Sequence, residues 1–166
     1  MRRLNITSQI PALDRKDLQL LGELQRDGRI ANAELASRVG LSESACLRRV
    51  RQLEAGGYIE RYAALLNAAK LGLGVGLLVR ITLKSQVDRE LRAFENAVRA
   101  VPEVVECYLT TGESDYVLRV VARSAEDIER IHSRVLTKLP GVARVESSFV
   151  LREVTRGASL PLERLG

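Results

Sequence analysis

Residues 42–52, SESACLRRVRQ, carry hydroxyl, guanidinium and amide groups at helical spacing. An arginine can donate two parallel hydrogen bonds to guanine O6 and N7 or hold a phosphate, so this stretch could read double-stranded DNA. The DNA-contact candidates are Ser42, Ser44, Ala45, Arg48, Arg49 and Gln52. Ser42 has a second role open to it, because its hydroxyl could cap the helix that follows. The alternative for the whole group is a solvated basic face on an ordinary helix.

The context of these residues favours DNA contact over that alternative. Residues 32–38 predict a short helix, Gly40 suits the left-handed turn that ends it, and the helix after Ser42 repeats Cys46, Val50 and Leu53 on one face. This is a helix-turn-helix, which places its second helix in the DNA major groove. A helix capped by Asp14 completes a three-helix unit. Its expected core is Leu13, Leu20, Leu21, Leu24, Ile30, Leu35, Ala36, Val39, Leu41, Cys46, Val50, Leu53 and Ile59.

The N-terminus of the helix at residue 32 departs from the usual capping pattern. Ala31 stands where Ser or Thr would form a capping box with Glu34. The cap is therefore Asn32 or is absent, and we expect a frayed start that costs about 1 kcal/mol.

A second polar group, Gly112-Glu113-Ser114-Asp115, lies between two predicted strands. Glycine lets a ligand carboxylate approach backbone N–H groups, and Asp115 could accept a hydrogen bond from an α-ammonium, directly or by holding the loop. The alternative is a hairpin turn whose aspartate bonds its own backbone.

The second half of the chain predicts a ferredoxin-like βαββαβ domain, which makes the fold class α+β. The expected elements are strands 74–83, 104–111, 115–122 and 142–154 and helices 87–101 and 125–139. Leu78 alternates with Val75, Leu77 and Val79, so both faces of the first strand look apolar. Because no third helix is available as a cover, we expect an obligate dimer through this sheet. The domains expected are an N-terminal arm 1–12, the helix-turn-helix domain 13–60, a packed hinge strand 61–73, the ferredoxin-like domain 74–154 and a tail 155–166.

Composition narrows the functional class. The net charge is +5 with 46% hydrophobic residues, which suits a folded domain that meets phosphates. Two cysteines and one histidine give neither a disulfide scaffold nor a conventional metal site or catalytic triad. We expect no metal, no cofactor and no enzyme activity. No signal peptide or membrane-spanning run is visible, so a cytoplasmic, nucleoid-associated protein is expected.

The chain resembles the Lrp/AsnC (leucine-responsive regulatory protein) family of transcription factors. The segments that carry the resemblance are LDRKDLQLLGELQRDGRI, ELASRVGLSESACLRRVRQLEAGGYI, YAALLN, LTTGESDYVLRV, LPGV and SSFVLREV. The resemblance implies a dimer or octamer that binds DNA near amino-acid metabolism genes, with an amino-acid effector, leucine- or methionine-like, in the C-terminal domain at a subunit interface. It implies the effector-binding residues Tyr108, Gly112, Glu113, Ser114, Asp115, Ser147, Ser148 and Phe149. For Ser147 and Ser148 the alternative is that they are ordinary strand residues.

We therefore expect a DNA-binding transcriptional regulator modulated by a small amino acid. One alternative is an architectural DNA-organising protein with little sequence preference and no effector. Another is an amino-acid-metabolising enzyme with a regulatory domain, which the missing acid–base constellation argues against.

Overall fold

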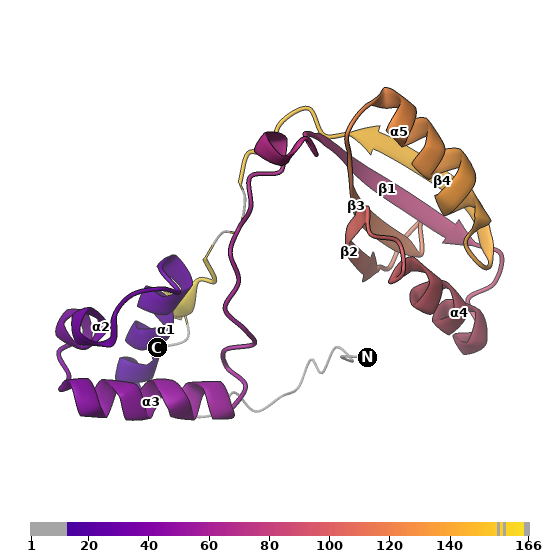
Figure 1. Cartoon of the computed structure of the whole chain (residues 1–166). Coiled ribbons are helices and arrows are strands. Elements are labelled where there is room, and N and C mark those ends of the chain that lie inside the picture. The colour runs from indigo at the N-terminus through magenta and orange to yellow at the C-terminus, as the bar shows by residue number, and fades with distance from the viewer. Residues whose placement is uncertain (1–12, 156, 158, 165–166) are drawn as a thin grey trace. The chain divides into compact units, whose positions relative to one another are not determined.

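The structure is a computed structural model that describes residues 13–155, 157 and 159–164 (Figure 1). The predicted arm 1–12 lies outside the described residues. The chain divides into two compact units. We call the first, residues 13–65 with the described part of 155–164, the helical unit. The second, residues 66–154, is the sheet unit.

The helical unit contains three α-helices, α1 (Arg15–Arg26), α2 (Asn32–Val39) and α3 (Glu43–Ala55), and a C-terminal 3-10 helix, Leu162–Arg164. Asp14 caps α1, Ser42 caps α3, and Gly40 ends α2 in the left-handed conformation with φ 64°, as predicted. Ala31 offers α2 no side-chain cap, and the Asn32 amide donates instead to the Glu43 carbonyl at 3.0 Å.

The core of the helical unit is the predicted one. Six side chains are buried, and seven partly buried side chains pack against them. The buried ones are Leu20, Leu35, Ala36, Val39, Cys46 and Leu53, and the partly buried ones are Leu13, Leu21, Leu24, Ile30, Leu41, Val50 and Ile59. All thirteen predicted core residues are confirmed. For those within the three helices, the 3.6-residue period of an amphipathic helix fixes which side chains face inward.

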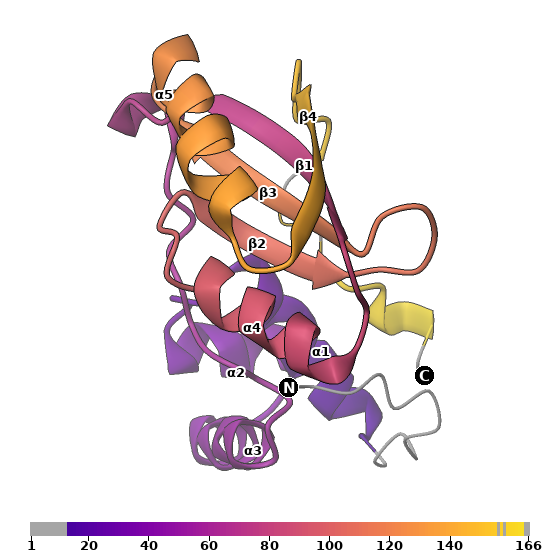
Figure 2. The same cartoon turned by 90° about the vertical axis from the view of Figure 1, so that its right-hand side faces the viewer.

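The sheet unit runs β1 (Val75–Leu83), α4 (Asp88–Val98), β2 (Val104–Leu109), β3 (Tyr116–Ala122), α5 (Ala125–Arg130) and β4 (Val142–Phe149). The strands are antiparallel in the order β2-β3-β1-β4, which is the predicted ferredoxin-like topology. Both helices cover the same face of the sheet (Figures 1 and 2). Twelve buried side chains form the core beneath them, among them Phe94 and Tyr116 with ring centroids 4.5 Å apart.

Three predicted elements of the chain differ from the structure. The helix expected at 125–139 is α-helical only over Ala125–Arg130. It continues as a π-helix, Ile131–Val135, and a 3-10 turn, Leu136–Lys138. The last strand ends at Phe149 instead of residue 154. The hinge strand at 61–73 is wrong: this segment holds a 3-10 helix, Ala69–Leu71, and no strand, and Leu65 and Leu66 are 76% and 62% exposed.

The face of the sheet away from α4 and α5, here called the open face, is less apolar than predicted. β1 contributes Leu78, which is 44% exposed, but it also contributes Arg80 to the same face. Arg119 of β3 lies there too and pairs with Glu106 at 3.1 Å and Glu153 at 3.4 Å. The prediction that both sides of β1 are apolar is therefore corrected to one apolar side and one mixed side.

Candidate DNA-binding helix and effector loop

One side of α3 faces solvent and carries most of the predicted DNA contacts. Ser44, Arg48 and Gln52 are exposed, and Ala45 is half-buried beside them. Arg51 lies on the same side, three residues after Arg48, and is also exposed. It was not among the predicted contacts, although its spacing of seven residues from Ser44 would have identified it. Within the described part of the chain, the guanidinium groups of Arg48 and Arg51 make no hydrogen bond or ion pair, so both can meet a phosphate or a base.

Ser42 acts first as the cap of α3. Its hydroxyl accepts a hydrogen bond from the Ala45 N–H at 3.3 Å and lies 3.3 Å from the Ser44 hydroxyl. Capping satisfies one of the free N–H groups of the first turn, which otherwise has no intrahelical acceptor. The side chain is exposed, so the cap leaves it accessible to DNA as well.

Arg49 differs from the other DNA-contact candidates, because its side chain turns toward α1. Its Nη1 donates to Asp14 Oδ2 at 2.7 Å and to Asp17 Oδ1 at 2.8 Å, and the side chain is 25% exposed. Hydrogen bonds to Asp17 and Asp14 raise the pKa of Arg49 above its ordinary value. The pKa of Asp14 is lowered, by the Asp17 backbone N–H first and by Arg49 second.

Two further polar contacts hold α2, and with it the turn before α3, against α1. The Lys16 ammonium donates to the Val39 carbonyl at the C-terminus of α2, where the helix dipole favours a cation. Arg38 of α2 pairs with Glu23 of α1 at 2.8 Å and with Glu34 of its own helix at 2.6 Å. The N-terminal half of α1 therefore contacts both helices of the helix-turn-helix through charged groups.

In the sheet unit, Asp115 is buried where the loop after β2 meets β1. Its Oδ2 accepts from the Leu83 N–H at 2.7 Å, and its Oδ1 accepts from the Gln86 side-chain amide at 2.7 Å. The residue is only 6% exposed. Both carboxylate oxygens are thus engaged within the chain, and Asp115 joins the loop 110–115 to the segment that leads into α4.

The rest of the predicted effector loop is open to solvent. Gly112 has a φ of 120°, a conformation that favours glycine, and Glu113 is exposed beside it. Ser114 is half-buried, and its carbonyl accepts from the Thr110 hydroxyl at 3.0 Å. Tyr108 lies on the open face at the sheet edge, and donation from its hydroxyl to Glu106 at 3.1 Å raises its pKa.

The predicted residues of β4 lie elsewhere in the sheet unit. Ser147, Ser148 and Phe149 pair with Val79, Leu78 and Leu77, whereas the loop carrying Asp115 meets β1 at Ile81 and Leu83. β4 is also the edge strand opposite β2. One chain therefore does not bring these two groups of predicted effector residues together. Ser147 lies 3.2 Å from His132 Nδ1 on the helix side, and neighbouring side chains of a strand point to opposite faces.

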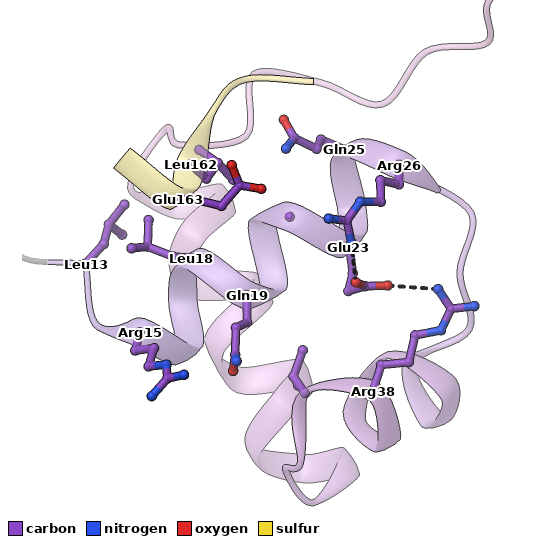
Figure 3. A pocket seen from close by; sticks show the side chains of 12 residues that line it. Leu13, Arg15, Leu18, Gln19, Glu23, Gln25, Arg26, Arg38, Leu162 and Glu163 are labelled. Carbon is purple, nitrogen blue, oxygen red and sulfur yellow. Dashed lines mark hydrogen bonds and ion pairs between the residues drawn. The ribbon is translucent and has the colours of Figure 1, made fainter. Parts of the chain in front are cut away.

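A groove on the helical unit contains none of the predicted site residues (Figure 3). It has a volume of about 590 Å³ and runs between α1, α2 and the C-terminal segment that carries Leu162. Within it Glu23 lies between Arg26 and Arg38 and pairs with both, at 2.7 and 2.8 Å. These three charges pair with one another, and Arg15 and Gln19 of α1 also line the groove.

The C-terminal segment is joined to α1 by a two-point contact. The Gln25 amide donates to the Leu160 carbonyl at 3.1 Å, and its oxygen accepts from the Leu160 N–H at 2.9 Å. Among the described residues, no group of three or more His, Cys, Asp or Glu side chains is placed to hold a metal ion. In that same part of the chain, no helix has both the length and the apolar character needed to cross a bilayer.

Two family models match the two units. Residues 13–60 match a model described as winged helix-turn-helix DNA-binding, and residues 77–160 match one described as Lrp/AsnC ligand binding domain. The described residues of the helical unit contain no strand, so the wing of the matched model has no strand counterpart there.

Similar proteins cover most of the chain. The leucine-responsive regulatory protein of Escherichia coli is 39% identical over 151 residues, which is 91% of this chain and 92% of that protein. An uncharacterised helix-turn-helix type transcriptional regulator of Sinorhizobium fredii is 49% identical over 72% of this chain and 94% of its own length. Among solved structures, a transcriptional regulator of Neisseria meningitidis in complex with L-methionine has a TM-score of 0.88 at 38% identity, covering 93% of this chain and 99% of that one.

Proposed function

The chain belongs to the Lrp/AsnC family of DNA-binding transcriptional regulators, and from this we propose its function. The protein binds particular double-stranded DNA sites through α3 and controls genes of amino-acid metabolism. A small amino acid, leucine- or methionine-like, binds the sheet unit at a subunit interface and changes DNA occupancy. Because its partner is chromosomal DNA, the proposal includes a cytoplasmic, nucleoid-associated location.

The observation that carries the DNA-binding part is the solvent-facing side of α3. Ser44, Arg48, Arg51 and Gln52 are all exposed there, and Arg48 and Arg51 are unpaired within the described residues. Arginine and glutamine are suited to bidentate contacts with guanine and adenine in the major groove. Ser42 and Ala45, in the first turn of the same helix, complete the proposed contact surface.

The assembly part of the proposal rests on the open face of the sheet. Leu78 and Tyr108 are exposed on that face, and β3, the strand between theirs, adds the half-buried Val117 and Val121. A second copy of the sheet unit would cover these side chains and form a dimer, and further association of dimers would give an octamer. A dimer would present two copies of α3 about one DNA turn apart, so half-site spacing would follow protein symmetry.

The effector part rests on the loop 110–115. The positive φ of Gly112 opens the backbone of this loop to a ligand carboxylate, and Asp115 holds the loop from below with both of its oxygens. In this role Asp115 acts by positioning the loop. Ser147, Ser148 and Phe149 would join the same site only if a neighbouring subunit supplied them. The L-methionine bound to the Neisseria meningitidis regulator supports a ligand of this chemical class.

Selection of duplexes from a random library, followed by fluorescence anisotropy, tests the DNA-binding part. A specific regulator should prefer its selected duplex over random DNA by more than about 10³-fold. Arg48→Ala should weaken binding to the selected duplex, while Arg89→Ala, an exposed arginine of the sheet unit, should not. A ratio below that value with binding retained would favour the architectural alternative, and no binding to any duplex would refute the proposal.

A thermal-shift screen against the twenty amino acids tests the effector part. A ligand present at 100 times its dissociation constant should stabilise the protein by about 2.7 kcal/mol. A shift with leucine or methionine, and none with aspartate or lysine, would support the proposed effector class. The absence of a shift with every amino acid would leave DNA binding in place and remove the effector from the proposal.

A further inference from the structure

We propose that Arg49 is a positioning residue, which fixes the orientation of α3 against α1 and does not itself contact DNA. This inference rests on the proposed function, because it concerns how α3 is presented to the duplex. It divides the arginines of α3 into two groups, with Arg48 and Arg51 facing the DNA and Arg49 facing the protein.

The geometry at the start of α1 carries the inference. Asp14 and Asp17 form a capping box, in which Asp14 Oδ1 accepts from the Asp17 N–H at 2.9 Å and Asp17 Oδ2 accepts from the Asp14 N–H at 3.1 Å. The two remaining oxygens accept from Arg49 Nη1 at 2.7 and 2.8 Å. All four carboxylate oxygens are therefore used, and Arg49 closes the capping box from a second helix.

The position of Arg49 along α3 agrees with this contact. It lies three residues after Cys46 and four before Leu53, and both of these side chains are buried. Residues at those spacings share one side of a helix. To reach a phosphate, the Arg49 side chain would have to leave two carboxylates that hold it on the protein side.

The pairing of Arg49 with Asp14 and Asp17 gives α3 a directional contact that its apolar core contacts do not provide. α3 packs on the unit through Cys46, Leu53 and the partly buried Val50, and such apolar contacts have little directional preference. Charged hydrogen bonds have defined donor and acceptor directions. Pairing of Arg49 with α1 therefore limits rotation of α3 about its axis, and that rotation decides where Arg48 and Arg51 point.

Asp17→Asn tests the inference, because a positioning role and a simple charge effect predict opposite changes in DNA affinity. The asparagine oxygen can still accept from the Asp14 N–H, but its amide group faces Arg49 with a donor. Removing an acidic side chain from a DNA-binding unit ordinarily tightens binding, because repulsion with phosphate falls. We expect the opposite here, a loss of about ten-fold on the selected duplex, which lies within the range for coupled residues.

Glu34→Gln is the matched control. Glu34, which is exposed, is also an acidic residue of the helical unit that pairs with an arginine, but its partner is Arg38 of the same helix, so the pair joins no two helices. This variant should bind the selected duplex as tightly as the wild type or slightly more tightly. Thermal unfolding followed by circular dichroism should show that both variants are folded at the temperature of the binding assay.

Salt dependence gives the second readout. Each lost phosphate contact lowers the slope of log K against log salt by about 0.9. Arg48→Ala or Arg51→Ala should lower the slope where the side chain holds a phosphate. Arg49→Ala should weaken binding at every salt concentration with the wild-type slope, and Arg49→Ala combined with Asp17→Asn should be no weaker than the worse single variant.

A lower slope in Arg49→Ala, tighter binding by Asp17→Asn, or additive losses in the double variant would each overturn the inference. If Arg49→Ala does not fold, Arg49→Lys replaces it, because a lysine ammonium can also donate to both carboxylates and should retain most of the binding. Wild-type protein that selects no duplex would instead refute the proposed function, so the two failures are distinguishable.

Discussion

Among the described residues, the core cluster of the helical unit contains six buried apolar side chains and that of the sheet unit contains twelve. In the helical unit, charged groups add to the apolar contacts between helices. Lys16 of α1 donates to the carbonyl at the end of α2, Arg38 pairs with Glu23, and Arg49 pairs with Asp14 and Asp17. In the sheet unit, the hydrogen-bonded register of four strands fixes the orientation of the elements, and the buried Asp115 carboxylate joins the loop 110–115 to β1. A unit with few apolar contacts uses directional charged contacts where orientation matters for function.

Truncation of a central aromatic residue should produce the largest effect and tests whether the sheet unit depends on its core. Phe94→Ala removes a fully buried ring that packs on Tyr116. We expect a loss of about 3–5 kcal/mol in the free energy of unfolding of the sheet unit, measured by urea denaturation. The exposed Val87, immediately before α4, gives the control Val87→Ala. A loss below about 1 kcal/mol for Phe94→Ala would contradict the comparison, since buried Phe→Ala changes cost several times more.

The buried carboxylate of the loop 110–115 should give the next largest effect. Asp115→Ala leaves the Leu83 N–H without its acceptor, and an unsatisfied buried donor costs about 1–3 kcal/mol. Calorimetric titration with L-methionine should show weaker binding, while anisotropy on the selected duplex should be unchanged. Glu113→Ala, in an exposed position of the same loop, is the stability control. If Asp115→Ala is destabilised but binds methionine as tightly as the wild type, the loop 110–115 is not part of the effector site.

An acid titration compares the charged contacts of the sheet unit with its core. Donation from Arg130 first, and from the Arg123 backbone N–H second, lowers the pKa of Asp127 from 3.8 to about 2. A carboxyl with a lowered pKa stabilises the folded state above its ordinary pKa, and that contribution disappears as the pH falls from 3.8 toward 2. Urea midpoints of the wild type should fall through this window, and Asp127→Asn should flatten the decrease. An equally steep decrease in both proteins would assign acid sensitivity to other groups.

The smallest predicted effect is a gain in the helical unit. Ala31 precedes α2 with φ −66° and ψ 144°, an extended conformation typical of a cap, and provides no side-chain acceptor. Ala31→Ser should supply one and raise the free energy of unfolding by about 0.5–1 kcal/mol. Ala31→Val, which adds bulk without an acceptor, should give no gain. Equal stability of the serine variant and the wild type would show that the start of α2 is already satisfied by other groups.

Sequence patterns predicted the helical core and the succession of helices and strands along the chain because both depend on local periodicity. The stripe of Cys46, Val50 and Leu53 follows from helical geometry alone. The same period also placed Arg49 on the buried side of the helix, although its charge favoured the prediction of a DNA contact. Its partners, Asp14 and Asp17, are more than thirty residues away, and residue type alone does not indicate such a pairing.

The weaker predictions concerned features that depend on distant segments. The segment around Leu65 and Leu66 was expected to pack because it is apolar, but an apolar segment forms a strand only where a sheet edge is available to pair with it. Ser147 and Asp115 were grouped by resemblance, whereas their separation follows from the order β2-β3-β1-β4, which places their strands on different parts of the sheet.

The contact between Gln25 and Leu160 determines which unit of the protein a truncated gene would affect. The last described residues, 159–164, belong to the same unit as α1, so the sheet unit is an insertion within a split helical unit. A reading frame that stopped after Val154 would encode every strand yet leave the DNA-binding unit without Leu160 and Leu162. A nonsense codon placed directly after codon 154 would therefore act first on the packing of α1 in the helical unit.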